Sequence, residues 1–147
     1  MECTNLSPAD LAARLRDAGL RVTSQRLDVY EALASSGLHL SPEQILARVR
    51  GRHPTISANT VYQVLETLVG AGAIRRADTG AGARRYDANM EPHHHLVCTT
   101  CGKQVDVPCD EGPTHGHELD DDLGFTIAEA RVTYMGTCPD CARAATG

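Results

Sequence analysis

Two pairs of cysteines constrain the fold of this 147-residue chain more than any other feature: Cys98 with Cys101, and Cys138 with Cys141. Each two-residue spacer lets both thiols of a pair point at one centre, and Gly102 permits the turn that such a knuckle needs. Four thiolates suit tetrahedral Zn²⁺. The alternative is a pair of reduced or redox-active thiols, but a thioredoxin-like pair needs a βαβ context that this sequence lacks.

We therefore expect a closed structural zinc site that stabilises a small domain and takes no part in catalysis. The two remaining cysteines, Cys3 and Cys109, are expected to be spectators.

The charge of the chain is unevenly distributed. The net charge of −5 divides into +3 for residues 1–86 and −8 for residues 87–147. This asymmetry predicts two domains with different tasks, joined by a short hinge at residues 87–92, with the second domain at 93–147. A polyanion would meet the first domain, and cations the second. The sequence shows neither a secretion signal nor an apolar run of membrane-spanning length, so we expect a cytoplasmic protein with no membrane partner.

Helix start and stop signals follow one another through the first half. Polar N-cap residues precede four stretches with helical apolar spacing, and they are Ser7, Thr23, Ser41 and Ser57. The stretch after Ser41 has Pro42 at its first position and Gln44 in a capping-box pattern. In the first helix Leu11, Leu15 and Ala18 are expected to form one buried stripe. Two helices across the tight turn RHPTIS, followed by a basic hairpin in AIRRADTGAGARRYD, predict a winged helix-turn-helix.

The second half has the pattern of short strands. HHHLV and KQVDV flank the first cysteine pair, FTIAEARVTYMG precedes the second, and GHELDDDLG is expected to form a short acidic helix. The predicted fold class is therefore α+β, an N-terminal winged helix-turn-helix followed by a small α/β domain with a Cys₄ zinc.

The three consecutive histidines indicate a second site. Side chains alternate along a strand, so His93 and His95 point one way, whereas His94 and Cys98 point the other. One ion can hardly take His93, His95 and Cys98 together. Three further donors support a separate nitrogen and oxygen site, and they are His39, Asp87 and Asp106. Spacing alone cannot place His39 in this site. Such mixed ligands suit Fe²⁺, Mn²⁺ or Zn²⁺.

Nearly the whole chain resembles the ferric uptake regulator superfamily of bacterial metal-dependent repressors. The matching pieces appear in family order between residues 11 and 141, and they are AGLRVTSQRLDVYEAL, HLSPEQILARVR, SANTVYQVLETLVGAG, RRYD, HHHLVCTTCGKQVDV and YMGTCPDC. The resemblance implies a homodimer with a DNA-binding winged helix and a C-terminal dimerisation domain. It also implies a repressor, not an enzyme.

The resemblance extends to the sensing site. The family's five regulatory ligands match His39, Asp87, His93, His95 and Asp106, and these would hold Fe²⁺ or Mn²⁺, with Zn²⁺ or Ni²⁺ as substitutes in vitro. Peroxide-sensing members carry Asp at both acidic positions, as this chain does, and the surroundings look like a branch tied to catalase-peroxidase control. The resemblance thus implies peroxide sensing through Fe²⁺ and control of oxidative-stress genes. Iron-responsive or other metal-responsive repression is the alternative.

DNA contacts are expected from three places. The recognition helix would present five side chains to the major groove, although some of them, Ser57 above all, could serve only as caps: Ser57, Asn59, Thr60, Tyr62 and Gln63. Many family members have Arg where Gln63 stands, and Gln reads adenine whereas Arg prefers guanine. Arg21 is placed to reach a narrow A/T-rich minor groove. The hairpin would contact phosphates through Arg75, Arg76, Arg84 and Arg85. A dimer would read an A/T-rich palindrome in double-stranded DNA.

Two rival functions and one further metal site find less support in the sequence. A zinc deaminase would need H-x-E and P-C-x-x-C, and neither is present. A zinc-ribbon interaction module without DNA binding would fit the acidic total charge, but not the basic hairpin. A third metal site around His94, with His115 or His117, lacks the family's other ligands, so solvated histidines are expected there.

Overall fold

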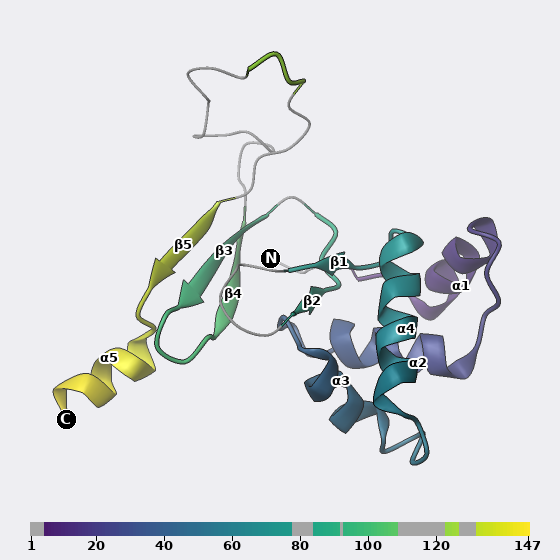
Figure 1. The fold of residues 1–147 in the computed structure, drawn as a ribbon, viewed down its shortest axis with the longest axis horizontal. Coiled ribbons are helices and arrows are strands. Elements are labelled where there is room, and N and C mark those ends of the chain that lie inside the picture. Colours follow the sequence, from purple (N-terminus) through teal and green to yellow (C-terminus); the bar gives the residue numbers. More distant parts are fainter. Residues whose placement is uncertain (1–4, 78–83, 92, 109–122, 127–131) are drawn as a thin grey trace. The chain divides into compact units, whose positions relative to one another are not determined.

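The computed structural model describes residues 5–77, 84–91, 93–108, 123–126 and 132–147 (Figure 1). The chain divides into two compact units, the first ending at Met90 and the second beginning at Glu91. Among the described residues, every helix is too short or too polar to cross a lipid bilayer.

Four helices make up most of the first unit: α1 (Pro8–Asp17), α2 (Ser24–Ala34), α3 (Pro42–Val49) and α4 (Ala58–Gly70). All four predicted N-caps are confirmed, because each cap side chain accepts a hydrogen bond from a backbone N–H of the first turn. Ser41 and Gln44 form the predicted capping box. These helix starts are determined by local contacts, because a cap side chain accepts hydrogen bonds from backbone N–H groups that have no acceptor within the helix.

The core of the first unit is almost entirely aliphatic. Leu15, Val29, Ile45, Val61 and Leu65 are inaccessible to solvent, and each helix contributes at least one of them. Leu11 and Leu15 confirm the predicted stripe of α1, but Ala18 does not belong to it. Ala18 is exposed because it is the C-cap, where the chain leaves the helical path before Gly19 at φ +73°.

A short two-stranded hairpin follows α4. Strands β1 (Arg75–Arg76) and β2 (Tyr86–Asp87) pair antiparallel, with Arg75 opposite Asp87 and Arg76 opposite Tyr86. We call residues 75–87 the wing; residues 78–83 of the predicted hairpin lie outside the described residues. Leu40, in the connection between α2 and α3, forms an isolated bridge with Tyr86. Helices α3 and α4 followed by this hairpin confirm the winged helix-turn-helix.

The second unit is built on a three-stranded sheet in the order β4-β3-β5. Strands β3 (His93–Cys98) and β4 (Gln104–Pro108) are antiparallel, whereas β5 (Thr133–Gly136) runs parallel to β3. Helix α5 (Pro139–Thr146) follows, with Pro139 at its start. The mixed helix and sheet content of the two units confirms the predicted α+β class. The expected acidic helix lies almost entirely outside the described residues, and so does part of the strand expected in FTIAEARVTYMG.

One face of this sheet is apolar and exposed. Leu96 of β3 stands opposite Val105 of β4 and Tyr134 of β5, so the three side chains share a face. They are 47%, 43% and 45% exposed, respectively. A contiguous apolar strip of this kind is typical of an interaction surface.

Candidate metal centres and DNA-contact surface

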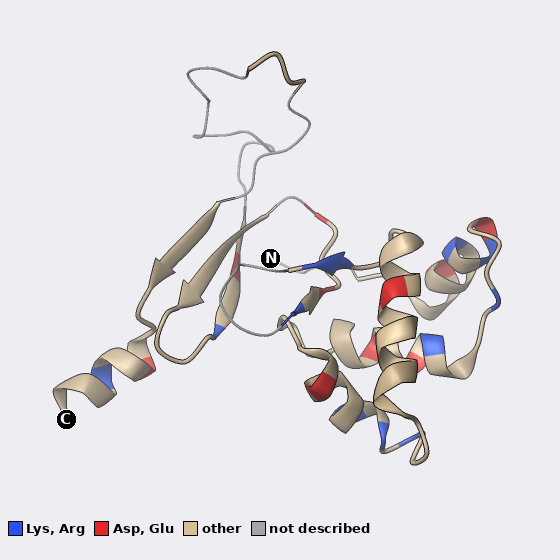
Figure 2. Cartoon of the chain, in the orientation of Figure 1, with Lys and Arg blue, Asp and Glu red and all other residues tan. Residues whose placement is uncertain are grey.

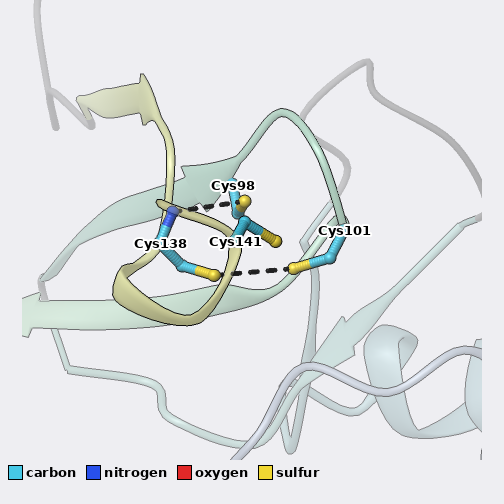
Figure 3. Close-up of side chains that lie close together, drawn as sticks. All are labelled: Cys98, Cys101, Cys138 and Cys141. Carbon is cyan, nitrogen blue, oxygen red and sulfur yellow. Dashed lines mark hydrogen bonds between the residues drawn. The ribbon is translucent and has the colours of Figure 1, made fainter. Parts of the chain in front are cut away.

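The four paired cysteines meet in the second unit (Figure 3). Cys98 ends β3, Cys101 lies in the turn toward β4, and Cys138 and Cys141 occupy the N-cap and first turn of α5. Their sulfur atoms all lie within 4.8 Å of one another. Gly102 has φ +75°, in the left-handed region, and its N–H donates to the carbonyl of Cys98, which closes the predicted knuckle.

This geometry fits a tetrahedral zinc ion. Four sulfurs at about 2.3 Å from one ion stand about 3.8 Å apart, and the Sγ atoms of Cys101 and Cys138 are 3.8 Å apart. The backbone N–H of Cys138 donates to Cys98 Sγ at 3.3 Å, so main-chain donors support the sulfur cluster. All four potential ligands of this cluster are sulfur atoms, and an all-sulfur set is typical of a structural zinc site.

The cysteines of this cluster differ in the pKa of their thiols. Backbone N–H groups of Cys138 and Cys101 lower the pKa of the Cys98 thiol to about 6. Hydrogen bonds with the Cys138 and Cys101 side chains raise the pKa of Cys141 to about 12. Zinc binding must therefore displace the Cys141 proton, whereas Cys98 needs little help to ionise.

A nitrogen and oxygen cluster lies at the other end of β3. The rings of His93 and His95 meet edge to face with centroids 4.7 Å apart, as expected for alternate residues of one strand. Asp106 pairs with His95 across the strands, and its Oδ1 is 3.5 Å from His93 Nε2 and 3.7 Å from His95 Nε2. The carbonyl of Glu91 lies 2.5 Å from His93 Nδ1, which leaves Nε2 as the ligand atom.

The first unit also contains an imidazole and a carboxylate that lie close together. His39 Nε2 and Asp87 Oδ2 are 3.0 Å apart, and both side chains are buried. Their positions follow from the bridge between Leu40 and Tyr86, which sets His39 and Asp87 on adjacent segments. The guanidinium of Arg85 donates to the carbonyl of His39 at 3.0 Å, so it also holds this segment in place.

His94 points away from its two neighbours and is buried, so the expectation of a solvated histidine is wrong at this position. Its Nδ1 accepts a hydrogen bond from the backbone N–H of Val132 at 3.1 Å, and its ring meets Tyr134 edge to face. The imidazole therefore helps to hold β5 against β3. The other histidines weighed for a third metal site, His115 and His117, lie outside the described residues, as do Cys3 and Cys109.

The candidate DNA-reading side chains divide by their contacts. Asn59 and Gln63 are exposed on α4. Ser57 caps the helix, because its hydroxyl accepts a hydrogen bond from the backbone N–H of Thr60 and forms a second one with the Thr60 hydroxyl. The hydroxyl of Tyr62 donates to Glu43 of α3 at 2.9 Å, a contact that sequence analysis does not predict.

The wing arginines are mostly engaged within the first unit. Figure 2 shows β1 in blue, the colour of Lys and Arg. Arg75 donates to the carbonyl of Met90, Arg76 binds the Glu66 carboxylate, and Arg85 binds the His39 carbonyl. Arg84 Nη1 is 3.9 Å from Glu66 and half exposed. Arg21 is exposed, and its carbonyl accepts from Arg26. The role of these five arginines in DNA binding stays a prediction.

Comparison with known proteins supports the resemblance seen in the sequence. The sequence model of the ferric uptake regulator family matches residues 17–135. The chain is 40% identical over 133 residues to the transcriptional regulator FurA of Mycobacterium tuberculosis, with 90% of each chain covered. It is 31% identical over 132 residues to the peroxide-responsive repressor PerR of Staphylococcus epidermidis, covering 88% of this chain and 86% of that one.

Its fold matches the ferric uptake regulator Fur of Helicobacter pylori with a TM-score of 0.79 and 26% identity, covering 97% of each chain. That structure is described as revealing three functional metal binding sites. Sequence match, relatives and fold agree. This chain belongs to the ferric uptake regulator family of metal-responsive transcriptional repressors, which are regulators and not enzymes.

Proposed function

We propose that this protein is a DNA-binding repressor that senses peroxide through Fe²⁺ and controls oxidative-stress genes. The regulatory ion is held jointly by His39 and Asp87 of the first unit and by His93, His95 and Asp106 of the second. The observation that carries this proposal is that each unit brings imidazole and carboxylate groups to within 3.7 Å of one another. Neither set alone reaches the five ligands, whereas together they make a nitrogen and oxygen set that suits Fe²⁺ or Mn²⁺.

Iron(II), when bound, would supply one electron to cleave the O–O bond of peroxide, and peroxide itself is the oxidant that delivers oxygen to an imidazole. The imidazoles that hold the iron are then the oxidisable groups nearest to that chemistry. Aspartate at both acidic positions supports the peroxide-sensing version, and His39 or His93 is the expected target. Oxidation of either imidazole removes a ligand of the ion, and the metal-dependent affinity for DNA is then lost.

Stoichiometric H₂O₂ added to the Fe²⁺-loaded protein tests this directly. Peptide mass spectrometry should show added oxygen on His39 or His93, and DNA binding should fall in parallel. The Mn²⁺-loaded protein is the control and should keep both its histidines and its affinity for DNA. Unmodified histidines and unchanged DNA binding in the iron-loaded sample would exclude peroxide sensing.

Iron-responsive or other metal-responsive repression without peroxide sensing is the second candidate. It is favoured by the fold match to the ferric uptake regulator Fur of Helicobacter pylori, which covers 97% of each chain. The same five ligands would serve it, and Zn²⁺ or Ni²⁺ could replace the physiological ion in vitro. The peroxide experiment separates the two candidates, since both predict metal-dependent DNA binding.

We propose Zn²⁺ for the sulfur cluster, which supports the second unit without contacting DNA. We propose that α4 enters the major groove of an A/T-rich palindrome, where Asn59 and Gln63 have exposed side chains. Arg84 and Arg21 would contact phosphate and the minor groove, respectively.

In this proposal the protein binds DNA as a homodimer. The apolar strip of Leu96, Val105 and Tyr134 supports it, because association would bury side chains that are nearly half exposed in one chain. Two copies of α4 related by two-fold symmetry would then read the two halves of the palindrome.

A further inference from the structure

The sequence of α4, ANTVYQVLETLVG, contains one charged residue, and that residue is acidic. A carboxylate on a helix proposed to lie against DNA would repel phosphates, so Glu66 needs an explanation. Figure 2 shows it as the red segment of α4.

Glu66 faces the wing and binds three side chains there. The hydroxyl of Tyr86 donates to Glu66 Oε1 at 2.7 Å, and Arg76 donates to both carboxylate oxygens. Arg84 approaches to 3.9 Å. The carboxylate therefore links α4 to the two sides of the hairpin.

Tyr86 connects this link to the candidate metal ligands. Its side chain is fully buried in the core of the first unit. Its backbone exchanges two hydrogen bonds with Leu40, at 3.0 and 3.3 Å. Leu40 follows His39 directly and Tyr86 precedes Asp87, so the two ligands sit beside the bridge. Because side chains alternate along a strand, Tyr86 and Asp87 leave β2 on opposite faces.

We propose that Glu66 is a positioning residue that couples metal binding at His39 and Asp87 to the orientation of α4, through its hydrogen bond with Tyr86. This inference rests on the proposed function. An ion that fixes Asp87 and His39 fixes the bridge, and the Tyr86 hydroxyl passes that constraint to the reading helix. A ligand shifts an equilibrium only through contacts that differ between the two states, so the hydrogen bond between Tyr86 and Glu66 must be weaker in the metal-free protein.

The test uses full-length, zinc-containing protein and a DNA site selected from random sequence by the Mn²⁺-loaded wild-type protein. The measured quantity is the ratio of the DNA Kd without Mn²⁺ to the Kd with Mn²⁺. Tyr86→Phe keeps the ring in the core and removes only the hydroxyl. We expect it to reduce the ratio about fivefold or more. Glu66→Ala should reduce the ratio to the same extent, although it also frees Arg76 and Arg84 to tighten binding in both states.

Tyr30→Phe is the matched control. Tyr30 is a second buried tyrosine of the first unit, and its hydroxyl accepts a hydrogen bond from the Leu6 N–H at 2.8 Å. This variant loses an equivalent contact on α2 and should keep the wild-type ratio. Hydrogen exchange gives an independent measurement: Mn²⁺ should protect the amides of α4 in the wild-type and Tyr30→Phe proteins, but not in Tyr86→Phe.

The outcomes separate the two levels of the proposal. A wild-type ratio of one would refute the metal-dependent function itself. A large wild-type ratio that Tyr86→Phe retains would refute the coupling and leave the function intact. Equal losses in Tyr86→Phe and Tyr30→Phe would also refute it, since any destabilisation of the unit would then act alike. In the double variant Tyr86→Phe with Glu66→Ala, a loss no larger than either single loss supports one shared link, and additive losses overturn it.

Discussion

Asp28 shows how a single, partly buried charge ties the helix-turn-helix together. Its two carboxylate oxygens meet Arg52 at 2.9 Å and His53 at 2.7 Å, both in the turn between α3 and α4. Burial opposes ionisation of Asp28, but hydrogen bonds from His53 and Arg52 outweigh it and lower its pKa. The pair with Arg52 is largely exposed and adds little, so the His53 contact carries most of the effect.

Replacing Asp28 with Ala should lower the free energy of unfolding by about 1–3 kcal/mol at pH 7, the usual worth of a charged hydrogen bond. A carboxyl whose folded pKa is depressed contributes stability above its unfolded pKa, near 4, and loses it as the pH falls through the folded value. The deficit of the variant should therefore shrink below about pH 4. Urea unfolding followed by circular dichroism at several pH values measures this.

The control for that experiment is Glu31→Ala, on the same helix but exposed. It should change stability by less than about 0.5 kcal/mol. A deficit of Asp28→Ala that persisted unchanged at pH 3 would contradict the assignment to ionised Asp28.

At the scale of elements, the sequence predicted what is decided locally. Ser7, Thr23, Ser41 and Ser57 each act within one turn of chain, so a four-residue pattern suffices to place a helix start. The alternation of His93 and His95 against His94 follows from strand geometry alone. Helix α5 has no apolar stripe from which the sequence could predict it, because it is short and exposed. Pro139 at its first position and the alanines after Cys141 were the available signals.

The contacts that sequence analysis missed join distant parts of the chain. Leu40 meets Tyr86 through backbone atoms, which carry no sequence signature. Glu66 meets Tyr86 from an element twenty residues away. The wing arginines could be counted from the sequence, but their intramolecular partners depend on this tertiary arrangement.

The sheet of the second unit yields a prediction about association. Leu96→Glu places a charge at the centre of the apolar strip, where burial in a dimer would require its desolvation. The dimer dissociation constant should rise at least about tenfold, which corresponds to about 1.4 kcal/mol. Sedimentation velocity across a concentration series measures it. Leu38→Glu, a similarly exposed leucine of the first unit, should leave association unchanged. Equal dissociation constants for both variants would exclude this face as the interface.

For the whole molecule, the proposed shared ion makes function depend on both units at once. Removing ligands from either unit should have the same consequence, because an ion held by half its ligands no longer connects them. A tenfold gain in DNA affinity on metal binding needs only about 1.4 kcal/mol of coupling.

His39→Ala and His93→Ala should each abolish the effect of Mn²⁺ on DNA affinity, although they lie in different units. Fluorescence anisotropy with labelled operator, with and without Mn²⁺, is the measurement. His94→Gln is the matched control next to His93, because the structure gives His94 a hydrogen bond to Val132 instead of a place in the cluster. If one of the two alanine variants kept the full response, the ion would not be shared in the proposed way.

The acidic charge of α4, the helix proposed to read DNA, has a consequence for how the protein would find its site. No cation lies on α4 and Arg76 of the wing binds Glu66, so α4 itself offers no charge that could displace the ions condensed on the double helix. Each neutralised phosphate adds only about 0.9 to the slope with which the logarithm of the DNA-binding constant falls against the logarithm of the salt concentration. Attraction to bulk chromosomal DNA would then be weak, and recognition would persist at ionic strengths that detach more basic repressors.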